Sequence, residues 1–183
     1  MPKLILIGGK ARNGKDTAAE YFKNKITEFG KKVAILHYAD LLKYLCKQYF
    51  DWDGQKDDKG RTILQYVGTN IVRDRNPDFW VKMADEIITN VLFDKDYIII
   101  PDCRFPNEID YWQNTNYETI SLRMIRTDYK SELTKAQQWH PSEIALDTYR
   151  FDWYIRASSL DELYKQCEYF LKEKVLKDEF ETA

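Results

Sequence analysis

GGKARNGKDT, residues 8–17, follows a short apolar run and precedes a stretch with helical periodicity. Gly9 and Gly14-Lys15 have the spacing of a phosphate-binding loop, although Asp16 stands where that motif carries Ser or Thr. Such a loop needs a strand that aims it, glycines that let the backbone approach an anion, and a helix N-terminus that faces the phosphates. The sequence supplies all three in order and therefore predicts a nucleotide-binding loop.

The segments outside this loop alternate between strand-like and helix-like patterns. Ile98-Ile99-Ile100 has no polar alternation, which is typical of a strand covered on both faces of a parallel sheet. The predicted strands are Leu4–Ile7, Val33–Tyr38, Tyr97–Ile100, Thr119–Met124 and, more weakly, Trp153–Arg156. The predicted helices are Thr17–Phe29, Leu41–Phe50, Thr62–Val72, Pro77–Val91 and Leu160–Leu171. This order predicts an α/β fold, a doubly wound parallel sheet of about five strands flanked by helices.

Capping signals and polar stretches complete this outline. Asn76 is the expected N-cap of the helix that begins at Pro77, and a capping box over Ser159–Glu162 begins the last helix. The polar stretches Asp51–Arg61 and Arg126–Glu143 are either surface loops or mobile lid segments. Lys172–Ala183 is expected to be a fraying polar end.

The composition bounds the organisation and the partners. The chain has 183 residues, 44% of them apolar and 15% aromatic, so residues 1–183 are expected to form one domain with a sizeable core. The formal net charge of −2 supplies no general attraction to nucleic acid, and we expect no nucleic-acid partner.

The cysteines and the N-terminus point to a cytoplasmic setting. Cys46, Cys103 and Cys167 are odd in number and far apart, which disfavours a disulfide framework or a C-x-x-C metal or redox site and predicts buried or incidental thiols. The first apolar run is too short for a membrane span and lacks the features of a signal peptide. We therefore expect a soluble cytoplasmic protein without a membrane partner, either a monomer or a homodimer.

The loop itself predicts a donor site. Lys15 would reach the terminal phosphates of a nucleoside triphosphate, and Mg²⁺ would be held by the Asp16 carboxylate or by the Thr17 hydroxyl. The residues expected to bind the nucleotide are Gly9, Ala11, Arg12, Asn13, Gly14, Lys15, Asp16 and Thr17.

Three further segments carry chemistry at predicted strand or helix ends. They are Tyr38–Lys43, Arg61–Thr69 with its continuation through Arg73 to Trp80, and Ile100–Glu108. Together with the Gly-Lys-Asp loop, the Leu-Gln-x-x-Gly-Thr, Pro-Asp-x-Arg and Ser-Leu-Asp-Glu-Leu motifs give the chain an order that resembles the deoxynucleoside monophosphate kinases found mainly in tailed bacteriophages. These belong to the P-loop kinase superfamily.

The resemblance implies transfer of the γ-phosphoryl group of ATP to a deoxynucleoside 5′-monophosphate with Mg²⁺. The partners would be small-molecule nucleotides, in the host cytoplasm if the protein is phage-encoded. Asp102 suits a Walker-B-type acid that holds the Mg²⁺ water shell. Arg104 and Arg126 would reach the transferring phosphoryl group or stack on the donor adenine, with surface ion pairing as the alternative. His140 and Glu143 belong to the same order of motifs, but we assign them no chemistry.

The acceptor side has a larger candidate set, and each member has a plainer structural alternative. Arg73 would clamp the acceptor phosphate or merely complement a helix dipole. Gln65 would bond a base edge, and Trp80 would stack on the base or belong to the core. Asp40 and Lys43 would touch sugar and phosphate, or serve as N-cap and solvated side chain. The full set is Asp40, Lys43, Arg61, Gln65, Thr69, Arg73 and Trp80.

Two other functions compete with this interpretation. A P-loop kinase for another small phosphorylated acceptor, such as the phosphomevalonate kinases, would share the loop but would give Gln65 and Trp80 no base to contact. A nucleotide-binding module without turnover would not require Asp102 and the arginines.

Overall fold

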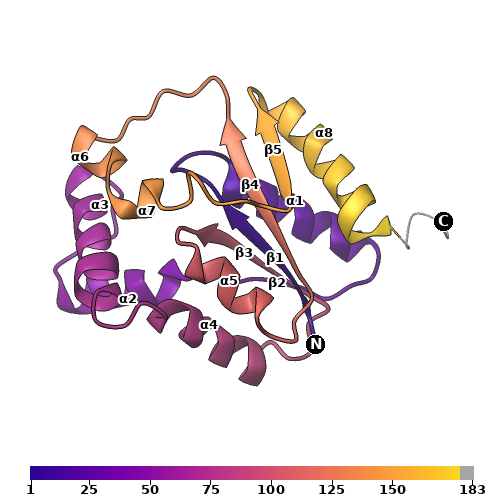
Figure 1. Cartoon of the computed structure of the whole chain (residues 1–183), viewed down its shortest axis with the longest axis horizontal. Helices are drawn as coiled ribbons and strands as arrows, with labels where there is room; N and C mark the ends of the chain where they lie inside the picture. The colour runs from indigo at the N-terminus through magenta and orange to yellow at the C-terminus, as the bar shows by residue number, and fades with distance from the viewer. Residues whose placement is uncertain (178–183) are drawn as a thin grey trace.

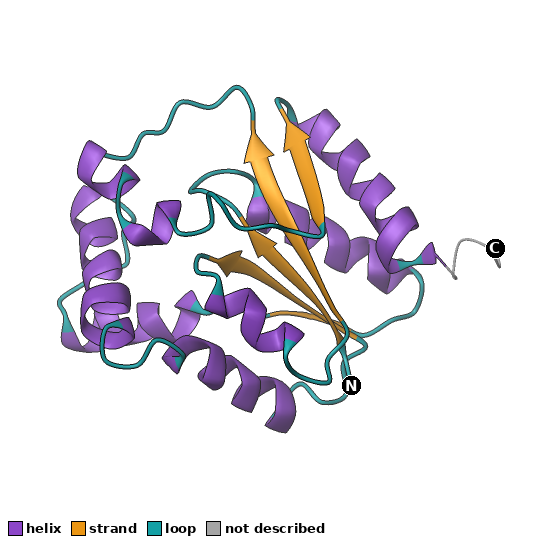
Figure 2. Ribbon diagram, in the orientation of Figure 1, coloured by secondary structure: helices purple, strands orange, loops and turns teal. Residues whose placement is uncertain are grey.

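The computed structural model describes residues 1–177, in which helices cover both faces of a five-stranded sheet (Figures 1 and 2). The strands lie in the order β2-β3-β1-β4-β5, and every neighbouring pair is parallel. They are β1 (Lys3–Gly8), β2 (Val33–Ile35), β3 (Tyr97–Cys103), β4 (Thr119–Arg126) and β5 (Trp153–Ala157). The doubly wound α/β fold and the five predicted strands are confirmed.

The sheet separates two hydrophobic clusters, which is why its central strands are apolar throughout. Along β1, Ile5 and Ile7 pack with α1 and α8 on one face, whereas Leu4 and Leu6 pack with α4 and α5 on the other. The helices are α1 (Lys15–Glu28), α2 (Ala39–Tyr49), α3 (Asp58–Gln65), the π-helical η1 (Tyr66–Arg73), α4 (Phe79–Asn90), α5 (Asn107–Gln113), α6 (Lys135–Gln138), α7 (Pro141–Ile144), α8 (Leu160–Phe170) and the π-helical η2 (Leu171–Val175).

The start of α4 differs from the prediction. The helix begins at Phe79 with Asp78 as N-cap, so Asn76 is not the cap and Pro77 is not the first helical residue. Polar groups of Pro77 and Asp78 in this turn accept hydrogen bonds from neighbouring elements. The carboxylate of Asp78 accepts a hydrogen bond from Asn107 of α5, and the carbonyl oxygen of Pro77 accepts one from Arg73. These long-range contacts override the local capping signal.

Helix α3 begins earlier than its periodicity indicates and takes up part of the polar stretch 51–61. The side chain of Asp57 caps it by accepting a hydrogen bond from the N–H of Gly60. A Cβ on Gly60 would lie 1.9 Å from the carbonyl oxygen of Gln55, so this position requires glycine. The indole of Trp52 is buried beside them and anchors the preceding loop.

The C-terminal part is more ordered than a fraying end. The capping serine is confirmed, because Ser159 accepts from the N–H of Glu162, but the Glu162 carboxylate turns to Ser158 and not back to Ser159. Beyond α8, η2 continues the helix, and Val175 and Leu176 are buried in the cluster beneath α1. Residues 178–183 of the predicted fraying end lie outside the described residues.

Three short helices, α5, α6 and α7, have no counterpart in the sequence prediction. Helix α5 buries Ile109 and Trp112 against the sheet. Helices α6 and α7 lie in the polar stretch 126–143, and Figure 1 shows its long connection running from the end of β4 across to α6, which lies beside α3. The three cysteines are free and buried, as predicted.

Candidate active site

The phosphate-binding loop has the backbone conformation that its glycines predict. Gly9 and Gly14 have φ angles of 148° and 77°, which residues with side chains rarely adopt. A Cβ on Gly9 would lie 2.7 Å from the carbonyl oxygen of Met124 in β4. Gly14 is the N-cap of α1 and provides no side-chain cap, so the first N–H groups of the helix are left for a ligand. The loop therefore fits the phosphates of a nucleotide.

Two cavities meet at this loop. The smaller, of about 380 Å³, lies between the loop, the end of β4 and the start of α8. The larger, of about 550 Å³, lies between the loop, the end of β3, and helices α2, α3 and η1. Arg12, Lys15 and Asp16 line both cavities. Both cavities thus reach the lysine that is predicted to contact the terminal phosphates.

Most of the predicted site residues line one of these cavities. The smaller cavity is lined by Arg12, Asn13, Gly14, Lys15, Asp16, Thr17 and Arg126. The larger is lined by Ala11, Lys43, Arg61, Gln65, Thr69, Arg73, Trp80, Asp102 and Arg104. Gly9 and Asp40 line neither. Ala11 and Asp102, which were predicted to contact the nucleotide and the metal, line the larger cavity together with the acceptor candidates, and the assignment of the cavities to donor and acceptor stays a prediction.

Lys15 is buried at the centre of the site. Its ammonium donates a hydrogen bond of 2.7 Å to the carbonyl oxygen of Lys10. Burial lowers the pKa of Lys15 to about 7, and the positive charge of Arg104 acts in the same direction, whereas nearby carboxylates oppose the change. A polyanion that entered the loop would favour the charged form of this lysine.

Asp102, in β3, is held by the start of α2. Its two carboxylate oxygens accept hydrogen bonds of 3.0 and 2.9 Å from the N–H groups of Tyr38 and Ala39. Burial raises the pKa of Asp102, while these N–H groups and the charge of His37 oppose the rise. This contact explains why β2 ends at Ile35 and not at the predicted Tyr38, because Tyr38 already has helical dihedral angles as the N-cap of α2.

The carboxylates near the loop fit a magnesium ion that arrives with a nucleotide. Within residues 1–177 no group of three or more His, Cys, Asp or Glu side chains forms a ready-made metal site. Mg²⁺ commonly takes one or two carboxylates and completes its shell with phosphate oxygens and water. Asp16 is mostly exposed, and its Oδ1 lies 3.1 Å from Nε2 of His37.

Both terminal nitrogens of Arg73 are already bound within the protein, whereas a phosphate clamp would need them free. Nη2 pairs with the carboxylate of Glu108, and Nη1 donates to Pro77 and Asn107. The guanidinium lies 3.9 Å from the ring centroid of Phe105. Among the guanidinium nitrogens of Arg73, Nε alone lacks a hydrogen-bond partner within residues 1–177. A grip by two terminal nitrogens would require the pair with Glu108 to open, so the acceptor role of Arg73 stays a prediction.

The remaining acceptor candidates include core and surface groups. The indole Nε1 of Trp80 donates to the carbonyl oxygen of Gly68, and the ring is buried, so Trp80 belongs to the core while it lines the cavity. Asp40 lies inside the first turn of α2 and is not its N-cap, so that alternative is wrong. Its carboxylate pairs with Lys43 at 2.8 Å.

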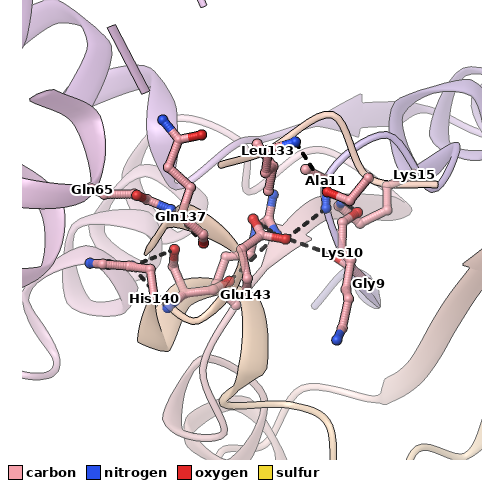
Figure 3. A network of polar contacts seen from close by, with 12 residues as sticks. Gly9, Lys10, Ala11, Lys15, Gln65, Leu133, Gln137, His140 and Glu143 are labelled. Carbon is pink, nitrogen blue, oxygen red and sulfur yellow. Dashed lines mark hydrogen bonds and ion pairs between the residues drawn. The ribbon is translucent and has the colours of Figure 1, made fainter. Parts of the chain in front are cut away.

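The segment 126–143 joins the two sides of the site. Gln65 donates to the carbonyl oxygen of Gln137 in α6, while Glu143 of α7 accepts from the N–H of Ala11 in the loop (Figure 3). His140 caps α7, accepting from the N–H of Ser142, which agrees with a structural role. Glu143 had no predicted role. Its only sequence signal was its place in the order of motifs, because its partners are more than 30 residues away.

The two arginines at strand ends differ in their surroundings. Arg126 is half exposed and pairs with Asp128 at 3.2 Å, which is a surface ion pair at the rim of the smaller cavity. Arg104 pairs with Glu143 at 2.7 Å and lines the larger cavity. The positive charge of Arg104 contributes to lowering the pKa of Lys15, which agrees with their common place in the wall of the larger cavity.

Comparisons with known proteins point to one family. The profile described as deoxynucleotide monophosphate kinase matches residues 55–167. A protein of Acanthamoeba polyphaga mimivirus, named provisionally as a deoxynucleotide monophosphate kinase, is 28% identical over 189 residues, covering 88% of this chain and 91% of that protein. No helix within residues 1–177 is long and apolar enough to cross a membrane.

Two solved structures superpose on the chain at low sequence identity. The APS kinase of Mycobacterium tuberculosis in complex with AMPPNP and APS is 12% identical, with 94% of this chain and 98% of that chain covered and a TM-score of 0.47. The shikimate kinase of Bacteroides thetaiotaomicron is 11% identical, with 93% and 97% covered and a TM-score of 0.48.

Proposed function

Because the chain belongs to the deoxynucleotide monophosphate kinase family, we propose that it transfers the γ-phosphoryl group of ATP to the 5′-phosphate of a deoxynucleoside monophosphate. One observation carries the proposal beyond family membership. Two cavities, one on each side of the phosphate-binding loop, share Lys15 in their walls. A kinase needs such an arrangement, because donor and acceptor phosphates must approach each other at one cationic group.

The proposed reaction is a direct phosphoryl transfer. The bond between the γ-phosphorus and the β,γ-bridging oxygen breaks, and an oxygen of the acceptor phosphate forms the new bond, which gives ADP and a deoxynucleoside diphosphate. Lys15 and Arg104 stabilise the negative charge on the transferring group. Mg²⁺, held with the triphosphate near Asp16 or Thr17 and Asp102, would supply further positive charge. The protein contributes alignment and electrostatic stabilisation.

An acceptor panel tests the function. ADP release from ATP is measured with the four common deoxynucleoside monophosphates, the matching ribonucleoside monophosphates and phosphomevalonate, each against a reaction without acceptor. We expect ADP release to depend on at least one deoxynucleoside monophosphate. Release that depends only on phosphomevalonate would assign the chain to the alternative acceptor class. ATP binding without acceptor-dependent release would favour a binding module.

Replacing Asp102 with asparagine tests its proposed contact with the metal shell. Asparagine keeps the shape but removes the charge, so we expect kcat to fall by about 10–100-fold, as for residues that orient a metal through water. The Mg²⁺ concentration for half-maximal activity should rise. The control is thermal unfolding without Mg²⁺, because asparagine can accept only one of the two backbone N–H bonds. A lower Tm with an unchanged Mg²⁺ titration would show that Asp102 holds the start of α2 and does not contact the metal shell.

A further inference from the structure

The carboxylate of Glu143 on α7 contacts both the phosphate-binding loop and Arg104. The side chain is 7% exposed. Oε2 accepts a hydrogen bond of 2.9 Å from the N–H of Ala11 in the phosphate-binding loop, and Oε1 accepts one of 2.7 Å from Nη1 of Arg104, after β3. Figure 3 shows Glu143 directed at the loop beside Gly9 and Ala11. The segment 126–143 thus contacts the reactive centre through this side chain.

The contact with Glu143 involves only one of the three guanidinium nitrogens of Arg104, Nη1. Nη1 donates to Glu143 and lies 3.2 Å from the carbonyl oxygen of Gly9 and 3.4 Å from that of Ser142. Within the described part of the chain, Nε and Nη2 of Arg104 have no hydrogen-bond partner. These two nitrogens form the side of a guanidinium that binds two oxygens of one oxyanion in parallel. Arg73, in contrast, has both terminal nitrogens bound within the protein.

We propose that Glu143 is a positioning residue that fixes Arg104 so that its Nε–Nη2 side is presented to the transferring phosphoryl group. The inference rests on the proposed function. Arginine has a long side chain with many rotamers, and a cation that is already in place needs no reorganisation when charge develops in the transition state. A carboxylate next to a phosphate site is unfavourable by itself, and its pairing with Arg104 offsets that cost.

A different role for Glu143, as a placeholder for phosphate, would affect kcat and ATP binding in the opposite way. If the carboxylate only occupied the Ala11 N–H until phosphate displaced it, its removal would tighten ATP binding and leave kcat unchanged. A positioning role predicts that kcat falls while the KM for ATP changes little.

The kinetic test is a double-mutant cycle between Glu143→Gln and Arg104→Ala. Glutamine keeps the shape of the side chain and removes its charge. We expect Glu143→Gln to lower kcat by about tenfold or more, with the KM for ATP within about threefold. In the Arg104→Ala background the same substitution should change kcat by less than about twofold, because the group to be positioned is gone. Effects that simply multiply, or an unchanged kcat with tighter ATP binding, would overturn the proposal.

Asp147→Asn is the matched control. Asp147 lies just beyond α7 and pairs with Lys10 at 2.9 Å and with Arg123 at 2.7 Å, so it also joins this part of the chain to the loop. Within residues 1–177, no hydrogen bond or ion pair joins Asp147 to Arg104. We expect its kcat to stay within about threefold of wild type. A loss equal to that of Glu143→Gln would show that any loosened anchor of the segment is sufficient, which contradicts a specific role.

A second measurement does not depend on turnover. In side-chain ¹⁵N–¹H spectra of the free protein, the Arg104 signals are assigned by their loss in Arg104→Ala. A guanidinium held by a carboxylate rotates slowly, so its Nη signals should be separate in wild type and Asp147→Asn and should merge in Glu143→Gln. Identical Arg104 signals in wild type and Glu143→Gln would overturn the proposal. If the acceptor panel fails but the signals merge, the proposed function is wrong and the Glu143–Arg104 pairing stands.

Discussion

Lys15→Ala should lower kcat by about 10²–10³-fold, the usual cost of removing one preorganised group that stabilises transition-state charge. Of the three residues that line both cavities, Lys15 is the buried cation, since Arg12 is half exposed and paired with Glu132 and Asp16 is an anion, so we expect no neighbouring side chain to replace it. The fold should survive, because the ammonium makes one hydrogen bond, to Lys10, and alanine is the best helix former. Steady-state kinetics at saturating ATP and acceptor, with circular dichroism of the same samples, measure both effects.

Lys10→Ala is the matched control in the same loop. Lys10 points to the surface and pairs with Asp147, and it lines neither cavity. Its replacement should leave kcat within about threefold of wild type, as for an exposed ion pair. If a folded Lys15→Ala protein turned over at a near-normal rate, or if both lysine variants lost activity equally, the role of Lys15 in charge stabilisation would be rejected.

The elements that the sequence predicted well are those whose signal is local and whose burial is complete. Ile98–Ile100 has no polar alternation because both faces of β3 are covered, one by each hydrophobic cluster. The phosphate-binding loop is equally local, since its glycines, its lysine and the flanking strand and helix are contiguous. Asp102 and Arg104 lie at the C-terminal end of β3, the edge of a doubly wound sheet at which the alternation of strands and helices predicts ligand binding.

The failures come from contacts between residues far apart in the sequence. Asn76 is a residue type that favours the N-cap position, but Asp78 is the N-cap of α4. The carboxylate of Asp78 accepts a hydrogen bond from Asn107, 29 residues away. Helix α5 is too short to show a period, and it is held by Ile109 and Trp112 in the core. A local pattern cannot include partners that only the tertiary fold supplies.

The sequence indicated which residues line the candidate site better than it indicated which side chains pair with one another there. Lys43, Arg61, Gln65 and Thr69 do line one cavity, to which they contribute from helices α2, α3 and η1. No sequence pattern indicated that the carboxylates of Glu108 and Glu143 would pair with terminal nitrogens of Arg73 and Arg104. Both acids lie in short helices that the periodicity did not reveal.

Glu108→Ala should destabilise the protein by about 3–5 kcal/mol, because it leaves a buried cation without its partner. Glu108 and Arg73 are both buried, so water cannot replace the lost pair. The same carboxylate accepts hydrogen bonds from the N–H groups of Arg104 at 2.6 Å and Phe105 at 3.1 Å, and these donors would also lose their acceptor. Urea unfolding measures the loss. The exposed pair of Lys25 and Glu28 is the control, and Glu28→Ala should hardly move the midpoint.

A double variant separates the buried charge from the packing. Arg73→Met with Glu108→Leu removes both charges and fills a similar volume, so it should be less destabilising than Glu108→Ala alone, although the Arg104 and Phe105 N–H groups still lack an acceptor. If Glu108→Ala unfolded at the wild-type urea concentration, the pair would be open in solution, and Arg73 would then be free to grip the acceptor phosphate with two nitrogens as its position in the sequence suggested. A large loss instead ties Arg73 to the scaffold that holds the backbone of Arg104, and leaves Arg104 as the arginine with a free bidentate side beside Lys15.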